Sequence, residues 1–562
     1  MNKKKIPYGK SDFKEVKLRN FYYVDKTRYI HEIENLSDYL FFIRPRRFGK
    51  SLFLSMLHYY YDEKYKQDFE EIFADTWILK NKTPEAHTYK ILRFNFSVVD
   101  SSRYKEGFYH HIKIRVNDFL DKYKIHIKFA SDNPLEILDE LFFKVRKRGL
   151  RIYCLIDEYD NFANELLSRE REEYQELVKG QESLYKQFFK ILKSATDMEN
   201  SPLKKMFITG VTPMTLFDVT SGFNIGDFIS TNPKLNSMVG FTREEIEEMF
   251  SYYGVKIDFE LLEKWYGNYR FSIKNKERVY NPDMILYYLK SWISTGSVPE
   301  ELADINMRTD YGKLKWLVYT GKDLNENFGV LEKLVNGEII TTDRIKDAFS
   351  AFELIDKDNF NSLLYYLGLV TIHDIKLDIE LKICNETIKS IVAEYISKII
   401  QTEKLFDLDL SEFKTKLKQF ALHGNLDAFQ YLAERLKQST GIRDYIKGEQ
   451  TVKMLHLVYL NLCSYYRVLS EPELNKKFAD IILLPKNEYV EYVGLIELKY
   501  IPRKESKNIE GLIERLKKQA ELQLKESAAD EMITYWTKEK NKKIGKVILI
   551  YYGWELVYMD VQ

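Results

Sequence analysis

The stretch Tyr39–Leu57, YLFFIRPRRFGKSLFLSML, carries the strongest structural signal in the chain. A short apolar run, Tyr39–Ile43, leads into a basic turn that ends in Gly49-Lys50-Ser51, and an apolar helical run follows. Strand, glycine-containing loop, Gly-Lys-Ser and helix is the order of a phosphate-binding loop, in which backbone N–H groups at a helix start face an anion. We expect Lys50 to reach the β- and γ-phosphates of a nucleotide and Ser51 to bind Mg²⁺.

The loop departs from the usual pattern at its start. The usual first glycine lies four residues before the Gly-Lys-Ser triplet, and here Arg44 stands near that place with Pro45 beside it. Because the segments on both sides fit, we interpret the stretch as a nucleotide-binding loop. We assign Arg46, Arg47 and Gly49 to nucleotide binding together with the lysine and the serine. The alternative is a basic turn that caps a helix.

An acid pair, Asp157-Glu158, directly follows the apolar run Ile152–Ile156. A continuous apolar run of this length is typical of a strand buried on both faces of a parallel sheet. At the end of such a strand we expect Asp157 to hold Mg²⁺ and Glu158 to orient the attacking water. The alternative is a strand end followed by a helix cap. Thr209 or Thr212, near the end of another apolar run, is a candidate for contact with the γ-phosphate or the water, unless it only forms a turn.

Alternating strand and helix patterns in the first third of the chain predict an α/β fold with a P-loop NTPase-type parallel sheet. The helical pattern of residues 241–293 predicts a helical lid. Two β-like runs around a turn at 367–383, followed by a helix at 385–400, predict a winged-helix-like middle, and residues 405–470 read as helical. From residue 479 the pattern becomes strand, turn, strand, helix and strand. We place the domains at 1–240, 241–300, 301–403 and 404–562.

A second group of polar residues lies near the C-terminus. Asp480 opens a predicted strand, and the next strand carries Glu497-Leu498-Lys499. Because alternate residues of a strand share a face, Glu497 and Lys499 point the same way, and the hairpin brings Asp480 opposite them. We predict that Asp480 and Glu497 bind a divalent metal and that Lys499 steadies the attacking water. The alternative is an exposed hairpin with a cross-strand ion pair.

The surroundings of this second group are basic. The formal net charge of +1 excludes polyanion binding by bulk charge, so any nucleic-acid surface must be a local patch. Glutamates are mixed among the basic and aromatic residues, so solvated helix faces are the alternative to a nucleic-acid track. The members of this cluster are Lys476, Lys477, Tyr500, Arg503, Lys504, Lys507, Arg515, Lys517, Lys518, Tyr535, Trp536 and 538–546. Secondary candidates for the site around Asp480 are Glu449, Glu473 and Gln523. The alternative for each of them is an ordinary solvated polar residue.

Length and composition limit the number of domains and the compartment in which the protein works. A chain of 562 residues is long enough for about three to five domains. Cys154, Cys384 and Cys463 are too far apart for a zinc site or a disulfide framework, which fits a reducing compartment. The N-terminus lacks an apolar leader core, and no stretch approaches about 18 uninterrupted apolar residues. We therefore expect a cytoplasmic protein with no membrane partner.

With these motifs, the chain resembles the bacterial AAA-ATPase-like proteins that carry a C-terminal PD-(D/E)XK nuclease superfamily domain. The resemblance covers most of the chain and rests on IPYGKSDFKEVKLRNFYYVDKTRYI, RPRRFGKSLFLSML, CLIDEYD, FITGVTPMTLFD, VGFTREEIEEMF, WYGNYRFS, VYNPDMILYYL and the Asp480…Glu497-Leu498-Lys499 core. It implies an ATP-binding domain of the additional-strand type and a C-terminal restriction-endonuclease-like α/β domain. The Gln-x-x-x-Tyr element of related nucleases is incomplete, because Ser527 stands four residues after Gln523.

These observations predict an enzyme that binds and hydrolyses ATP with Mg²⁺ and whose nucleotide state gates a metal-dependent nuclease. Nucleic acid is the expected partner, with DNA or RNA left open, and a homo-oligomer is possible. The main alternative is a regulatory ATPase whose nuclease fold is inactive and serves only binding. A third is a kinase-like phosphotransferase, although no acceptor motif is evident. Arg243 and Arg270 are candidates for an arginine that reaches the γ-phosphate, with an ion pair inside its own helix as the alternative for Arg243.

Overall fold

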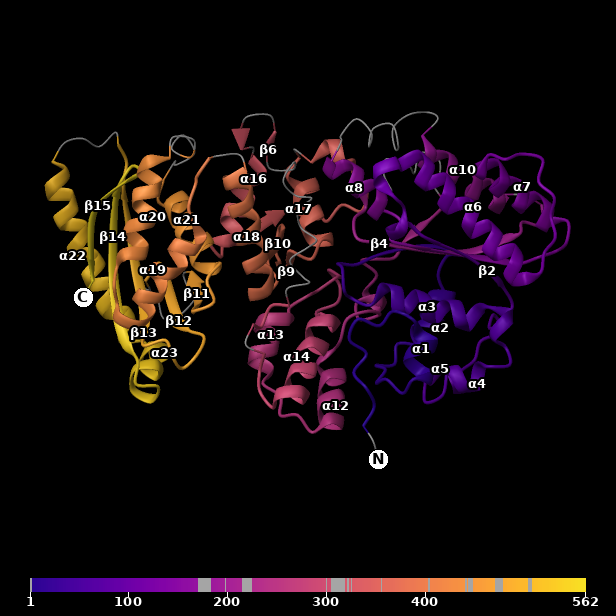
Figure 1. The fold of residues 1–562 in the computed structure, drawn as a ribbon, viewed down its shortest axis with the longest axis horizontal. Coiled ribbons are helices and arrows are strands. Elements are labelled where there is room, and N and C mark those ends of the chain that lie inside the picture. The colour runs from indigo at the N-terminus through magenta and orange to yellow at the C-terminus, as the bar shows by residue number, and fades with distance from the viewer. Residues whose placement is uncertain are drawn as a thin grey trace. The chain divides into compact units, whose positions relative to one another are not determined.

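The computed structural model describes residues 3–169, 183–197, 199–214, 225–299, 301–304, 319–320, 323–324, 326–354, 356–402, 405–439, 442, 448–470, 479–503 and 508–561 (Figure 1). The chain divides into two compact units. Unit 1 comprises Met1–Leu317 and Thr341–Glu386, and unit 2 comprises Val318–Ile340 and Thr387–Gln562. The segment 301–403 is therefore shared between the units, and its winged-helix-like character and the four domain boundaries stay predictions.

Unit 1 is built on a parallel sheet with the strand order β2-β3-β4-β1-β5. The strands are β1 (Tyr39–Ile43), β2 (Lys90–Asn95), β3 (Ile152–Asp157), β4 (Leu203–Gly210) and β5 (Asp227–Phe228). This sheet confirms the predicted α/β class. It also places β4 between β1 and β3, so an additional strand separates the two strands that carry the predicted site motifs. Strand β2 ends at Asn95, because a 3₁₀ turn follows at Phe96–Val98.

Helices cover both faces of this sheet, as expected for strands that are apolar on both sides. Every residue of β3 is buried. Figure 1 shows one helical layer that contains α3 and another that contains α6, α7 and α10. The helices of unit 1 up to the end of the sheet are α1 (Phe13–Leu18), α2 (Tyr29–Glu34), α3 (Lys50–Tyr61), α4 (Phe69–Ile72), α5 (Trp77–Lys80), α6 (Tyr104–Tyr123), α7 (Pro134–Arg146), α8 (Asn161–Arg169) and α10 (Leu184–Asp197).

Three helices after the sheet occupy the segment for which a helical lid was predicted, and their role as a lid stays a prediction. They are α12 (Arg243–Tyr253), α13 (Phe259–Tyr266) and α14 (Pro282–Thr295). Thr242 and Glu245 form a reciprocal capping box at the start of α12, and Asn281 caps α14 ahead of a proline in its first turn. Farther along, α17 (Lys357–Tyr366) precedes the predicted hairpin of β9 (Val370–Ile375) and β10 (Ile379–Ile383), which pairs with β8 (Ile340–Thr342). The helix that follows the hairpin is α18 (Glu386–Thr402).

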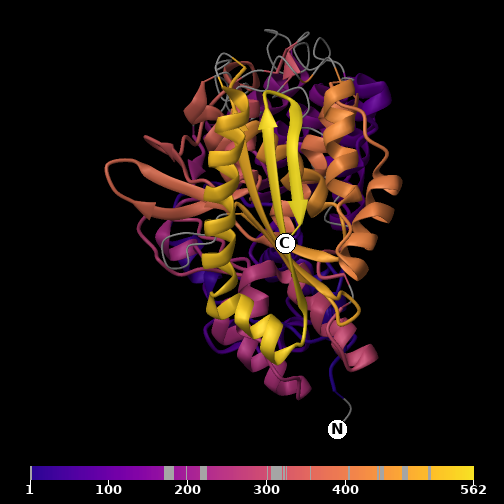
Figure 2. The same ribbon diagram turned by 90° about the vertical axis from the view of Figure 1, so that its left-hand side faces the viewer.

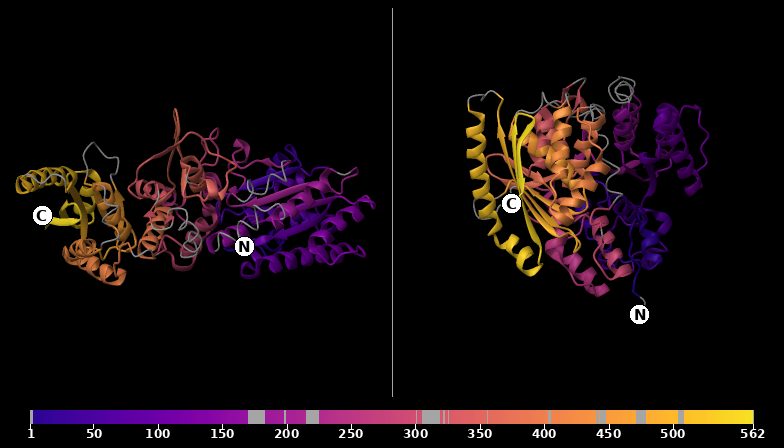
Figure 3. Two further views of the ribbon diagram at one scale, coloured as in Figure 1. Left: turned by 90° about the horizontal axis from the view of Figure 1, so that it is seen from above. Right: turned by 60° about the vertical axis from the view of Figure 1, so that its left-hand side comes forward.

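Unit 2 contains a mixed sheet with the order β11-β12-β13-β14-β15, in which only β13 and β14 are parallel. Helix α22 lies on one face of it and α19–α21 lie on the other (Figure 2; Figure 3, right). The strands are β11 (Tyr466–Ser470), β12 (Ile481–Pro485), β13 (Tyr492–Ile501), β14 (Lys543–Tyr552) and β15 (Glu555–Val561). The other elements are β6 (Tyr319–Thr320), β7 (Asp323–Leu324), α16 (Glu326–Val335), α19 (Leu410–His423), α20 (Asp427–Gln438), α21 (Glu449–Asn461), α22 (Ile509–Ala528) and α23 (Glu531–Thr534).

Two sequence-based expectations for unit 2 were wrong. The segment 405–470 is not wholly helical, because its last five residues form the edge strand β11. The final apolar segment, for which a single strand was expected, is a hairpin of β14 and β15. Gly553 between these strands has a φ of 60°, which suits a tight turn. Among the described residues, no helix is both long enough and apolar enough to cross a membrane.

Candidate functional site

The basic loop between β1 and α3 has the geometry of a phosphate-binding loop. Gly49 caps the helix with a φ of 92°, a left-handed conformation that glycine adopts without strain. Helix α3 begins at Lys50, so the N–H groups of its first turn, which have no partner within the helix, lie at the end of the loop. This arrangement provides the backbone donors and the positive end of the helix dipole that an anion needs.

Lys50 lies beneath this loop. Its side chain is 6% exposed, and Nζ donates to the carbonyl oxygens of Arg44 and Pro45, both at 2.9 Å. Burial lowers the pKa of Lys50 to about 8, although the nearby carboxylates of Glu158 and Asp157 act to raise it. The ammonium is thus held by two neutral acceptors that the oxygens of a charged phosphate can replace.

Arg44, at the place of the usual first glycine, is a structural residue. It is 2% exposed, and its guanidinium donates to the carbonyls of Ile43, Ser230 and Leu235. The guanidinium carbon also lies 4.5 Å from the ring centre of Phe42 and 4.3 Å from that of Phe271. The arginine therefore fixes the start of the loop from below, in place of the flexibility that a glycine would give.

The acid pair and Thr209 meet at the carboxyl ends of adjacent strands. Asp157 ends β3 and is 1% exposed, and its Oδ1 accepts a 2.6 Å hydrogen bond from the hydroxyl of buried Thr209 in β4. Glu158 follows with a φ of 49°, which is uncommon for a residue other than glycine. Burial raises the pKa of Glu158, while Lys50 opposes the rise. The structure thus brings together the predicted residues from β1, β3 and β4.

Asp160 was not predicted from the sequence, and it joins the turns that follow β3 and β4. Its carboxylate accepts hydrogen bonds from the backbone N–H groups of Val211 and Thr212, at 3.1 and 2.7 Å, and from the Thr212 hydroxyl. The neighbouring Tyr159 adds a hydrogen bond from its hydroxyl to the Thr212 carbonyl. The sequence signal for these contacts was the third acidic residue of the segment CLIDEYD.

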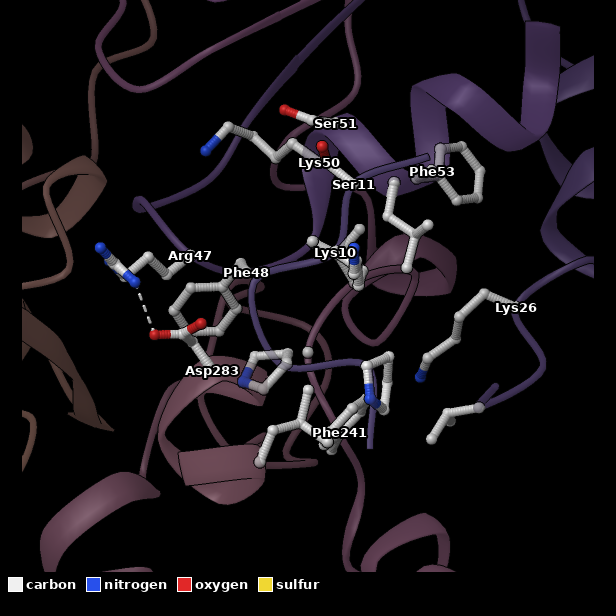
Figure 4. Close-up of a pocket in the computed structure, with 18 of the residues that line it drawn as sticks. Lys10, Ser11, Lys26, Arg47, Phe48, Lys50, Ser51, Phe53, Phe241 and Asp283 are labelled. Atoms are coloured by element: carbon white, nitrogen blue, oxygen red, sulfur yellow. Dashed lines mark hydrogen bonds and ion pairs between the residues drawn. The ribbon is translucent and has the colours of Figure 1, made fainter. Parts of the chain in front are cut away.

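A cavity of about 360 Å³, within the size range of small-molecule sites, lies next to the loop (Figure 4). Its lining combines Lys50, Ser51 and Glu158 with residues of the N-terminal segment and of the lid. These additional residues, to which sequence analysis gave no role, include Lys10, Tyr22, Tyr23, Lys26, Phe241 and Asp283. Cationic and aromatic side chains in one cavity suit a ligand with phosphates and a flat apolar ring.

The remaining arginine candidates are engaged in protein contacts. Arg46 donates to Asn161 Oδ1 at 2.8 Å, and Arg47 pairs with Asp283 of the lid at 2.8 Å, although both arginines also line the cavity. Arg243 pairs with Glu247 of its own helix at 3.4 Å, which is the simpler of its two expected roles. Arg270 is 7% exposed and donates to three carbonyls of its own loop, 272–275, so it holds that loop together.

In unit 2, the structure brings Asp480, Glu497 and Lys499 together. Ile481 lies opposite Ile496 in the β12–β13 ladder, so Asp480 falls opposite Glu497, and Asp480 Oδ2 accepts the Leu498 N–H at 2.8 Å. Lys499 Nζ lies 2.5 Å from Glu497 Oε1. Glu497 is fully buried, and burial, together with the charge of Asp480, raises its pKa to about 7.

The comparisons with known proteins match both units. Residues 7–220 match the family model "Predicted AAA-ATPase", and residues 447–561 match that of the PD-(D/E)XK nuclease superfamily. The chain combines an AAA-ATPase-like domain with a PD-(D/E)XK nuclease superfamily domain. The matched ranges contain the phosphate-binding loop and the Asp480, Glu497 and Lys499 group, respectively.

Individual relatives are more distant. An uncharacterized protein in the vnfD 5′ region of Azotobacter chroococcum mcd 1 is 27% identical over 320 residues, and the match covers 54% of this chain and 56% of that relative. Two solved structures are similar at low TM-score. Cdc6p from Pyrobaculum aerophilum has a TM-score of 0.25 at 14% identity, with 65% of this chain and 88% of that chain covered. The Aeropyrum pernix ORC2 protein has a TM-score of 0.32 at 12% identity, with 67% and 92% covered.

The nuclease superfamily domain departs from the family pattern at Ser527. This serine is fully buried in α22, where its hydroxyl donates to the Gln523 carbonyl and accepts from the N–H of Ala479, the residue before Asp480. Gln523 Oε1 is buried without a hydrogen-bond partner among the described residues. The serine therefore ties α22 to the start of β12.

A divalent metal fits only part of this nuclease-domain site. The Oε2 atom of buried Glu497 has no hydrogen-bond partner in the described part of the chain, and such an atom needs a cation or a proton. Asp480 lies opposite it. However, the described ranges contain no group of three or more His, Cys, Asp or Glu side chains that could hold a metal. Glu449 is the first residue of α21, and Glu473 lies outside the described residues.

The basic and aromatic cluster around the nuclease domain is only partly described. Lys476, Lys477, Lys504 and Lys507 lie outside the described residues. Of the rest, Arg503 stacks on Trp554 with 3.6 Å between the guanidinium carbon and the ring centre, and Tyr535 is 48% exposed. Exposed aromatic rings beside cationic side chains are features of surfaces that bind single-stranded nucleic acid.

Proposed function

We propose that the AAA-ATPase-like domain binds and hydrolyses ATP. The observation that carries this proposal is the cavity beside the loop, because it places the buried Lys50 ammonium, the Ser51 hydroxyl and the Glu158 carboxyl around one space. Lys50 would exchange the carbonyls of Arg44 and Pro45 for the β- and γ-phosphate oxygens. The proposal also takes support from the family model that matches residues 7–220.

The residues around the acid pair fit a bound magnesium ion. Ser51 and Asp157 would hold Mg²⁺, which supplies charge to the phosphates during phosphoryl transfer. Thr209 fixes the rotamer of Asp157 through their 2.6 Å hydrogen bond. Glu158 would orient the attacking water, and the turn that carries it is held in place by the contacts of Asp160 with β4.

For the C-terminal domain we propose a metal-dependent nuclease whose activity depends on the nucleotide state of the ATPase domain. Asp480 and Glu497 would hold the metal, which polarises the scissile phosphate, and Lys499 would position the attacking water. The alternative is a nuclease fold that only binds nucleic acid. The lack of a three-residue metal cluster among the described residues favours this alternative, whereas the unpartnered Oε2 of Glu497 favours a metal site.

Two assays test the two halves of the proposal. Calorimetric titration with ATP should show binding by the wild type and by the exposed-lysine control Lys66→Ala, and strongly weakened binding by Lys50→Ala. Labelled DNA and RNA should be incubated with Mg²⁺ or Mn²⁺, with and without ATP. Cleavage should be lost in Asp480→Ala and Lys499→Ala and kept in Lys525→Ala on exposed α22. Binding without cleavage under every condition would favour the alternative.

A further inference from the structure

A second lysine, Lys453, belongs to the environment of Asp480. It lies in α21, one helical turn after Glu449, and its side chain is only 1% exposed. Its Nζ is 3.9 Å from Asp480 Oδ1. Helix α21, which carries Lys453, lies on the opposite face of the sheet from α22, which carries Ser527 (Figure 2). A lysine that is 1% exposed is costly to bury as a lone charge, and the carboxylate of Asp480, which is 13% exposed, offsets part of that cost.

With Lys453 included, each carboxylate of the site has its own cation. Lys499 pairs with Glu497 at 2.5 Å, and Lys453 faces Asp480 at 3.9 Å. These two carboxylates and two ammonium groups sum to a formal charge of zero, and the nearby carboxylate of Glu449 also acts on Lys499. The protein therefore already supplies two positive charges beside the predicted metal ligands. Of these four side chains in the described part of the chain, Glu497 has an oxygen, Oε2, without a hydrogen-bond partner.

A divalent ion at Asp480 would have to approach the Lys453 ammonium. Like charges a few ångströms apart in a partly dry environment repel strongly, and a lysine that is 1% exposed has no nearby water into which it can move its charge. We propose that Lys453 competes with the divalent ion for Asp480 and so lowers the metal affinity of the nuclease-domain site. This inference rests on the proposed metal site of Asp480 and Glu497.

The test is the titration of the full chain with Mn²⁺, with bound ion followed by electron paramagnetic resonance. The variants Lys453→Met and Lys453→Gln remove the charge, and glutamine keeps a hydrogen-bond donor for Asp480 if methionine prevents folding. The matched control is Lys389→Met. Lys389 is another buried lysine of the same unit, 6% exposed, and it donates to the Val468 carbonyl rather than facing Asp480. Glu497→Gln identifies which part of the signal comes from this site.

Both Lys453 variants should bind Mn²⁺ about tenfold or more tightly than the wild type, and Lys389→Met should not change the affinity. Tightening that Glu497→Gln abolishes would support the inference. If the wild type shows Glu497-dependent binding and the folded Lys453 variants bind equally or more weakly, the inference fails while the metal site stands. If neither the wild type nor any Lys453 variant shows Glu497-dependent binding, the proposed metal site fails together with the inference.

Discussion

The lowered pKa of Lys50 should make the proposed ATP binding sensitive to pH between about 7.5 and 9. Burial lowers this pKa to about 8, from an ordinary value of about 10.4. Only the ammonium form attracts phosphates, so the binding-competent fraction is about 0.76 at pH 7.5 and about 0.09 at pH 9. The apparent dissociation constant should therefore rise about eightfold between these pH values, a loss of about 1.3 kcal/mol. Phosphates raise the pKa in the complex, so binding takes up a proton.

Calorimetry of ATP binding at a series of pH values measures both effects. The terminal phosphate is already ionised over most of this range, so it adds little titration of its own. Proton uptake follows from titrations in buffers with different ionisation enthalpies, and about half a proton is expected at pH 8. Lys50→Met is the control, because its weaker affinity should not depend on pH between these limits. A wild-type affinity that stays flat from pH 7.5 to 9 would refute the reasoning that phosphate binding depends on a Lys50 ammonium with a lowered pKa.

Three substitutions test the surroundings of the loop. Glu158→Gln should keep ATP affinity and slow single-turnover hydrolysis strongly, because it removes the carboxylate and keeps the shape; an unchanged rate would move the role to another residue. Arg44→Gly should destabilise the ATPase domain by about 3–5 kcal/mol in thermal unfolding, because three carbonyls lose a charged donor and a buried side chain is deleted; a stability loss below about 1 kcal/mol would contradict its structural role. Asp160→Asn should destabilise the domain by about 1–3 kcal/mol, because an asparagine amide has one acceptor oxygen where the carboxylate has two, and its NH₂ group would face one of the donors. An undiminished melting temperature would show that these hydrogen bonds do not stabilise the domain.

Residues that follow buried strands were the easiest part of the site to predict. Lys50, Asp157 and Thr209 come after apolar runs, and the carboxyl ends of parallel strands meet at one edge of the sheet. The parity of Glu497 and Lys499 was equally accessible, because alternation along a strand is a local property. In both cases the positions of the residues along a predicted strand are enough to place their side chains at one edge, or on one face, of the sheet.

Contacts between distant helices and loops were not predictable in this way. Lys453 lies in a helix that reads as an ordinary amphipathic segment, and only the packing of α21 on the sheet brings it to Asp480. Likewise, Lys10 and Tyr22 join the cavity because the N-terminal segment runs past the loop, which no local periodicity records. The edge strand β11 was read as helix because short apolar runs are ambiguous between the two structures.

The hydrogen bonds that Asp160 accepts have a consequence for how this protein can vary among its relatives. The two backbone N–H groups that it binds belong to Val211 and Thr212, whose side chains can change without removing the donors. The acceptor, by contrast, is a single carboxylate beside Gly210, where an added Cβ atom would lie 2.3 Å from the Tyr159 ring and 2.7 Å from the Asp160 carboxylate. A residue larger than glycine at position 210 should therefore require changes at both 159 and 160, and an alignment of relatives should show coupled substitution at these three positions.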